Sequence, residues 1–270
     1  MSLLASAATA GPSALVAVVI DDLGYQPALD RAALELDPRV AVGVIPDAPG
    51  ARQVALAAAQ QGREVLIHLP LSHAGPDDCQ VTLCPGLDWS AERMHRHLEW
   101  AARQVPLAVG LNNHQGSAFT ADAAATRRLV EGLVLLNRQR EAPLFVVDSR
   151  TTPHSQLAHE AARAGIAVGQ RRVFLDHDRS PEAIAGAWMR LLERARTSGQ
   201  AIAIAHPYPE TLAFLARVLP GLDAGDVALV TISELVKSPP GASSASQPPG
   251  LALPPARPAH ESPTASPQNR

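Results

Sequence analysis

Short apolar runs alternate with alanine-rich stretches along most of this 270-residue chain, and this alternation limits the folds it can adopt. The runs are rich in Val, Ile, Leu and Ala and do not alternate with polar residues, which is typical of strands buried on both faces of a parallel sheet. The stretches between them predict helices. The runs occupy residues 15–20, 40–45, 64–69, 107–111, 144–147, 173–175, 201–205 and 227–230.

Capping residues mark where the predicted helices begin. Ser90 is the expected N-cap of a helix over 91–104, Thr120 of a longer helix towards Arg138, and Ser180 of a later helix. Seven or eight strand–helix units in about 220 residues favour a (β/α) barrel, with an open α/β sheet as the alternative.

The two ends of the chain differ from this pattern. Residues 1–13 are expected to form a flexible N-terminus, since they lack the basic region and long apolar run of a signal peptide. Residues 238–270 hold 9 of the 24 prolines, together with many Ser and Ala residues. Such a segment buries too little apolar surface to offset its ordering entropy, so we expect a disordered tail. The single folded domain is therefore predicted over residues 14–237.

Charge and cysteine content exclude several classes of protein. With 23 basic and 26 acidic residues the formal net charge is −3, which argues against a nucleic-acid partner. No apolar stretch reaches the ~18 residues of a transmembrane segment. Two cysteines exclude a disulfide-dense scaffold and a four-cysteine zinc site. Cys79 and Cys84 either close one small disulfide in an oxidising compartment or are two unrelated thiols.

Polar residues follow six of the apolar runs. In parallel α/β folds the reactive side chains gather at the carboxyl ends of the strands. Each residue alone has an ordinary explanation as a helix cap, a turn residue or a core histidine, but one shared site explains all six strand ends together. The residues are Asp21 and Asp22, His68, the segment 112–117 (Asn-Asn-His-Gln-Gly-Ser), the segment 148–152 (Asp-Ser-Arg-Thr-Thr), Asp176 and His177, and His206.

These residue types suit metal-assisted hydrolysis. One Asp and two His form a common ligand set for a catalytic divalent metal that keeps one position open for water. We expect Asp22, His68 and His114 to be the ligands and zinc to be the metal. A second carboxylate, Asp21, is the expected general base, and His206 is the expected acid for the leaving group.

The remaining rim residues receive supporting roles. Asp148 and Arg150 are expected to orient the catalytic groups or to shift their pKa values. The sequence contains no G-x-S-x-G motif of a serine hydrolase and no glycine-rich nucleotide-binding motif. The residues expected to contact substrate are Asn112, Asn113, Ser149 and Asp176.

Several segments, taken in order, resemble the divergent polysaccharide deacetylases, a bacterial branch of the NodB-like carbohydrate deacetylase superfamily. The resemblance covers roughly residues 15–236 and implies a distorted (β/α)7-8 barrel and a metal-dependent carbohydrate de-N-acetylase. It maps the base and metal-binding aspartates of the superfamily onto Asp21 and Asp22, the strand-end metal histidine onto His68, and the late catalytic histidine onto His206. The matching segments are 18–25 (VVIDDLGY), 62–70 (GREVLIHLP), 109–117 (VGLNNHQGS), 147–152 (VDSRTT), 172–176 (RVFLD) and 203–207 (AIAHP).

One departure from the ordinary deacetylase motif concerns the second histidine. That motif is H-x3-H, whereas four residues, including Pro70, separate His68 from His73 here. Because a change of one residue turns a side chain away from a metal, we expect His114 rather than His73 to be the ligand.

Three functional hypotheses follow. The leading one is a hydrolase that removes N-acetyl groups from an acetylated glycan. The resemblance implies the cell envelope or periplasm, while the lack of a signal-peptide pattern in residues 1–13 leaves the cytoplasm as the alternative. The alternative is a non-catalytic module on the same barrel that binds a glycan or an envelope partner protein. A phosphoester hydrolase ranks last, because phosphate sites recruit more basic groups than Arg150 alone.

Overall fold

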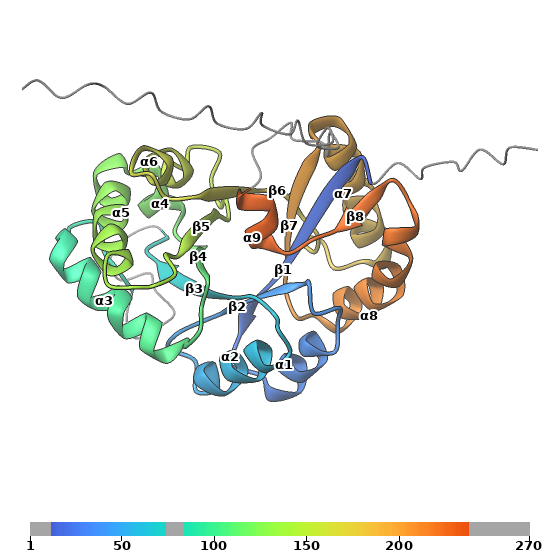
Figure 1. Ribbon diagram of the computed structural model, residues 1–270, viewed down its shortest axis with the longest axis horizontal. Coiled ribbons are helices and arrows are strands. Elements are labelled where there is room, and N and C mark those ends of the chain that lie inside the picture. Colours follow the sequence, from blue (N-terminus) through green and yellow to red (C-terminus); the bar gives the residue numbers. More distant parts are fainter. Residues whose placement is uncertain (1–11, 74–83, 238–270) are drawn as a thin grey trace, which may run out of the picture.

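The computed structural model describes residues 12–73 and 84–237, and these form one barrel of parallel strands surrounded by helices (Figure 1). The predicted disulfide includes Cys79, and the predicted tail spans 238–270; both lie outside the described residues. The strands are β1 (Ala14–Leu23), β2 (Ala41–Val44), β3 (Val65–Leu71), β4 (Gly110–Gln115), β5 (Phe145–Asp148), β6 (Val168–Phe174), β7 (Gln200–Ala205) and β8 (Val227–Leu229).

The helices follow the strands in the expected alternation. Ser90 and Ser180 cap helices as predicted, accepting from the N–H groups of Arg93 and Ala183. The prediction for Thr120 is wrong, because a short helix already contains it and Asp122 caps the longer one. The helices are α1 (Pro27–Leu34), α2 (Ala51–Gln60), α3 (Ala91–Gln104), α4 (Ser117–Ala121), α5 (Ala123–Asn137), α6 (Leu157–Arg163), α7 (Pro181–Ser198), α8 (Pro209–Val218), the 3-10 helix η1 (Leu219–Ala224) and α9 (Ile232–Lys237).

The barrel closes through β1, the strand that carries the aspartate pair. Strands β2 to β7 pair in chain order, and β7 then pairs with β1. On its other edge β1 pairs with two strands: its first residues, 14–16, contact β8, and residues 19–23 contact β2. Seven strands therefore form the ring, and β8 fills the gap at the end where the strands begin, which we call the lower end. This closure confirms the predicted distorted barrel and excludes the open sheet.

The barrel interior changes from apolar to polar along the strands. Side chains alternate across a strand, so every second residue faces inward. The lower layers hold an apolar cluster that includes Val19, Leu66 and Ile204, and α9 lies across the ring of strands with Ile232 and Leu235 in the same cluster (Figure 1). Two residues further along these strands, the same inward rows reach Asp21, His68 and His206. The packed lower layers thus support a polar upper layer.

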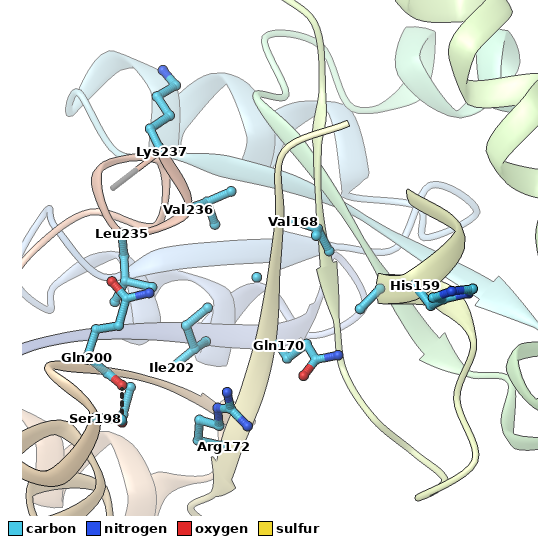
Figure 2. Close-up of a pocket in the computed structure, with 13 residues that line it drawn as sticks. His159, Val168, Gln170, Arg172, Ser198, Gln200, Ile202, Leu235, Val236 and Lys237 are labelled. Carbon is cyan, nitrogen blue, oxygen red and sulfur yellow. Dashed lines mark hydrogen bonds between the residues drawn. The ribbon is translucent and has the colours of Figure 1, made fainter. Parts of the chain in front are cut away.

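Helices cover the outside of the ring with a larger apolar core. Among the described residues, no helix combines the length and apolar character that crossing a bilayer requires. At the lower end, α9 and the starts of β6 and β7 line a cavity of about 540 Å³, where Val168, Ile202 and Val236 provide apolar walls (Figure 2). This cavity lies at the opposite end of the strands from the aspartate pair.

Candidate metal and active site

Three potential ligand atoms converge at the top of β1, β3 and β4. Asp22 Oδ1 lies 2.8 Å from His114 Nδ1 and 3.1 Å from His68 Nε2, and the two imidazole nitrogens are 3.2 Å apart. Tetrahedral zinc with bonds of about 2.0–2.2 Å separates neighbouring ligand atoms by roughly 3.3 Å. The predicted trio is therefore brought together with the spacing of a metal site, and it forms a recognisable ligand cluster.

The chemistry of Asp22 supports the same reading. Its Oδ1 is buried and has no partner in hydrogen-bond geometry among the described residues, although two nitrogens face it. Burial opposes ionisation, but the neighbouring His114 and His68 outweigh it and hold the pKa of Asp22 well below its usual range. An ionised oxygen facing two imidazole nitrogens fits a divalent cation.

Asn112 fixes the orientation of His68. The amide Nδ2 of Asn112 donates to both carboxylate oxygens of Asp21, at 2.9 and 2.8 Å. Its Oδ1 then faces His68 Nδ1 at 3.0 Å, and can only accept. The proton of a neutral His68 therefore resides on Nδ1, which leaves the Nε2 lone pair free to bind a metal.

Asp21 is a buried carboxyl group, only 1% exposed. Burial raises the pKa of Asp21, although the charge of His68 and the hydrogen bond from Asn112 act in the opposite direction. Gly43 on β2 provides the space for this carboxyl group, because a Cβ atom there would lie 2.0 Å from Asp21 Oδ1. A raised pKa suits a carboxylate that has to take up a proton near neutral pH.

His206 forms a second pair with Asp176. Its Nδ1 lies 3.0 Å from Asp176 Oδ1, and its backbone N–H donates to Oδ2 at 2.7 Å. Burial lowers the pKa of the imidazole, but Asp176 and the charge of Asp22 outweigh it, so the net shift is upward. The ring packs edge-on against Phe174, and Nε2 points to the metal cluster, 3.6 Å from Asp22 Oδ2. Asp176 therefore holds His206 with its Nε2 directed at the ligand cluster.

Backbone strain concentrates at this rim. Asp22, Gln115 and Arg150 have φ angles of 63°, 52° and 47°, in the left-handed region that non-glycine residues rarely adopt. At Asp22 the pairing of β1 with β2 also shifts register. Strain of this kind persists where the surrounding structure enforces it, and it is common at functional sites.

A cavity of about 530 Å³ opens beside these groups. Asn113 and Ser149 line it, as expected of residues that contact substrate, whereas Asn112 and Asp176 do not. Asn112 is bonded to Asp21 and His68, and Asp176 to His206 and to Thr211 Oγ1 at 2.9 Å. These contacts give both residues a supporting position behind Asp21, His68 and His206.

The loop after β5 is arranged differently from the prediction. Asp148 is fully buried and accepts from the backbone N–H of Arg150 and from Ser155 Oγ, so it organises the loop. The guanidinium of Arg150 donates to the Pro153 carbonyl and lies outside the cavity. Arg171 lines the cavity instead, a residue that the sequence analysis missed because it lies before the predicted strand 173–175.

Two further histidines, His73 and His97, lie outside the ligand cluster. His73 lines the cavity but does not belong to the ligand cluster, which agrees with the choice of His114. The position of His97 on its predicted helix suggested a solvent-facing side chain. Instead, His97 is buried between Trp89 and Trp100. It belongs to the core.

Comparison with known proteins gives the same fold. A solved structure of an uncharacterized protein from Agrobacterium tumefaciens C58 aligns with a TM-score of 0.74 at 21% identity, covering 84% of this chain and 91% of that one. A mutant CE4-family pseudoenzyme with restored enzymatic activity aligns with a TM-score of 0.50 at 16% identity, covering 83% and 68%. At these identities the likeness concerns the fold.

Sequence comparison identifies the family. Uncharacterized protein YibQ from Escherichia coli K12 is 35% identical over 225 residues, which are 83% of this chain and 68% of that protein. The sequence model of the divergent polysaccharide deacetylase family matches residues 18–236, and this range includes every residue of the site described above. The chain belongs to the divergent polysaccharide deacetylase family.

Proposed function

We propose that this protein is a metal-dependent hydrolase that removes N-acetyl groups from a glycan of the cell envelope. The observation that carries the proposal is the convergence of Asp22 Oδ1, His68 Nε2 and His114 Nδ1 beside a buried carboxyl group. Membership of a family named for polysaccharide deacetylation supports the choice of substrate class and of the amide bond.

Asp22, His68 and His114 would hold the ion, and zinc suits one carboxylate and two imidazoles. When bound, a divalent ion supplies Lewis-acid activation of water and of the acetyl carbonyl group. By holding the proton on Nδ1, Asn112 would leave the Nε2 lone pair of His68 available to the ion.

Two residues move the protons of the reaction. Asp21 accepts a proton as the water oxygen bonds to the carbonyl carbon. Protonated His206, held by Asp176, donates to the amine nitrogen as the carbon–nitrogen bond breaks. The products are acetate and a free amino sugar. Asn113 and Ser149 line the cavity where the sugar would lie.

The test combines metal analysis with acetate release from N-acetylated glycans. Zinc-loaded protein is expected to release acetate, and Asp22→Ala and His114→Ala are expected to lose both bound zinc and activity. His73→Ala is the matched control, because His73 lines the same cavity outside the ligand cluster. Metal-replete protein that releases no acetate from any acetylated glycan would overturn the proposal.

The alternative is a module that binds a glycan without turnover. The CE4-family pseudoenzyme of similar fold regained activity by mutation. This fold therefore occurs in proteins without turnover, which supports the alternative. Asp21→Asn separates the two functions, since it removes the proton acceptor and keeps the side-chain shape. An enzyme loses its rate and keeps its glycan affinity, whereas a binding module has no rate to lose.

A further inference from the structure

A second pocket beside the active site is built almost wholly from arginine. It has a volume of about 380 Å³, and its lining residues are Pro153 and four arginines. Arg150 comes from the loop after β5, Arg171 and Arg172 from β6, and Arg194 from α7. We call this group the arginine pocket. Arg172 also lines the cavity beside α9, and Figure 2 labels it there.

The positive charge of this pocket is not balanced by its own walls. No lining residue is acidic. Within residues 12–73 and 84–237, Arg172 and Arg194 take part in no ion pair, whereas Arg196, also on α7, pairs with Asp226 at 2.8 Å. Asp148 lies close by, but it is fully buried and its oxygens already accept from Arg150, Ser155 and Ala158.

One of the four arginines is rigidly placed. The Arg171 guanidinium donates to the carbonyl oxygens of Ser149 and Arg150, so it cannot swing out to relieve repulsion. Burial lowers the pKa of Arg171; the charge of Asp148 opposes this shift, and the positive charge of Arg150 adds to it. The pocket walls themselves offer no carboxylate to the exposed arginines, and guanidinium groups bind oxyanions through paired N–H donors.

We infer that the arginine pocket binds a phosphate group, either free or carried by a sugar. Arg172 and Arg194 supply donors, together with the N–H groups of Arg150 that do not contact Pro153, and Arg171 forms the wall shared with the active-site cavity. Phosphate binding here requires no turnover. It therefore stands or falls separately from the proposed deacetylation.

The test is calorimetric titration of inorganic phosphate into chelator-treated full-length protein at low ionic strength. Removing the metal prevents phosphate from binding at the active site through an ion. We expect Arg172→Gln/Arg194→Gln to weaken phosphate binding by roughly tenfold or more, since each arginine gives a charge-assisted contact. Arg190→Gln is the matched control, because it removes the same charge one turn earlier on α7, outside the pocket.

Three results would overturn the inference: no phosphate binding by the wild type, equal binding by the double variant, or an equal loss in Arg190→Gln. Circular dichroism checks the fold of each variant. If the double variant does not fold, the single variant Arg194→Gln replaces it, because the Arg194 side chain is exposed. N-acetylglucosamine 6-phosphate identifies the source of the phosphate. If this sugar phosphate binds more tightly than inorganic phosphate, and the arginine variant loses that binding, the phosphate group is carried by a sugar. If the two affinities are equal, free phosphate is the ligand.

Discussion

Asn112 connects the proposed base to the proposed metal site through one amide group. Asn112→Ala removes the acceptor that holds the proton on His68 Nδ1, so His68 Nε2 is no longer kept free. Loss of such a supporting contact typically weakens metal binding by about 10–100-fold. We expect a loss of this size for zinc, measured by competition with a chromogenic chelator. The control His73→Ala should keep wild-type affinity, and an unchanged affinity in Asn112→Ala would refute the role given to Asn112.

Gly43 on β2 is required by Asp21 on the adjacent strand β1. Gly43→Ala places a methyl carbon 2.0 Å from Asp21 Oδ1, so the carboxyl group or a strand has to shift. We expect a loss of about 1–3 kcal/mol in the free energy of unfolding, measured by urea denaturation, together with a loss of acetate release.

Gly186→Ala is the matched change for this experiment. In helix α7 the added methyl group meets only the end of a flexible side chain, Arg190 Nη1 at 3.5 Å, and alanine favours the helix by roughly 0.5–1 kcal/mol. Equal effects of the two substitutions would show that the contact with Asp21 has no importance.

The sequence predicts individual site residues where a polar residue ends an apolar run. Asp22, His68 and His114 were found in this way, because carboxyl ends of parallel strands meet at one edge. Gly43 and Arg171 could not be found, since their importance comes from a neighbouring strand and not from their own segment. Asn112 was found as a site residue, but its supporting role was not, because its partners Asp21 and His68 are distant in the sequence.

At the scale of the element, strand ends were predicted too short for a physical reason. Strands β1 and β4 continue through Asp21, Asp22 and the segment 112–115, because polar side chains can face the barrel interior once they bond to one another. Strand β6 begins five residues before the predicted run 173–175, with a mixed sequence that hydrophobicity alone does not identify as a strand. Apolar runs therefore locate the buried part of a strand but not its functional end.

Helix α3 carries a buried histidine that makes stability depend on pH. His97 stacks on Trp100, and its Nε2 has no hydrogen-bond partner among the described residues. Burial, assisted by the charge of Arg93, lowers the pKa of His97 to about 4 from 6.5. Between these values the unfolded chain binds a proton that the folded chain does not, so stability falls as pH falls from 6.5 towards 4. The full contribution is about 3 kcal/mol.

His97→Phe keeps an aromatic ring in place and removes the titration. We expect this variant to lose less stability than wild type between pH 7 and pH 4.5 in urea unfolding experiments. His95→Gln, on the same helix but partly exposed, should retain the wild-type pH dependence. Parallel pH profiles for wild type and His97→Phe would contradict the assignment.

At the scale of the molecule, the alternation of apolar runs and helices favoured a barrel over an open sheet, and the family resemblance implied its distorted form. The closure could not be predicted in detail, because β1 shares one edge between β8 and β2, an arrangement set by contacts over 200 residues of sequence separation. This shared edge places the aspartate pair where the ring is completed. The candidate metal site therefore joins β1, β3 and β4, strands from separate parts of the chain.

Because the ligands come from separate strands, metal binding should stabilise the whole barrel. A ligand that binds only the folded state adds about 2.7 kcal/mol at a concentration 100 times its Kd. For a domain of this size each kcal/mol raises Tm by roughly 2–4 °C, so saturating zinc should raise Tm by several degrees and a chelator should reverse the change. Scanning calorimetry of Asp22→Ala should show no such shift, while His73→Ala should behave as wild type. A zinc-dependent shift that persists in Asp22→Ala would place the metal elsewhere in the chain.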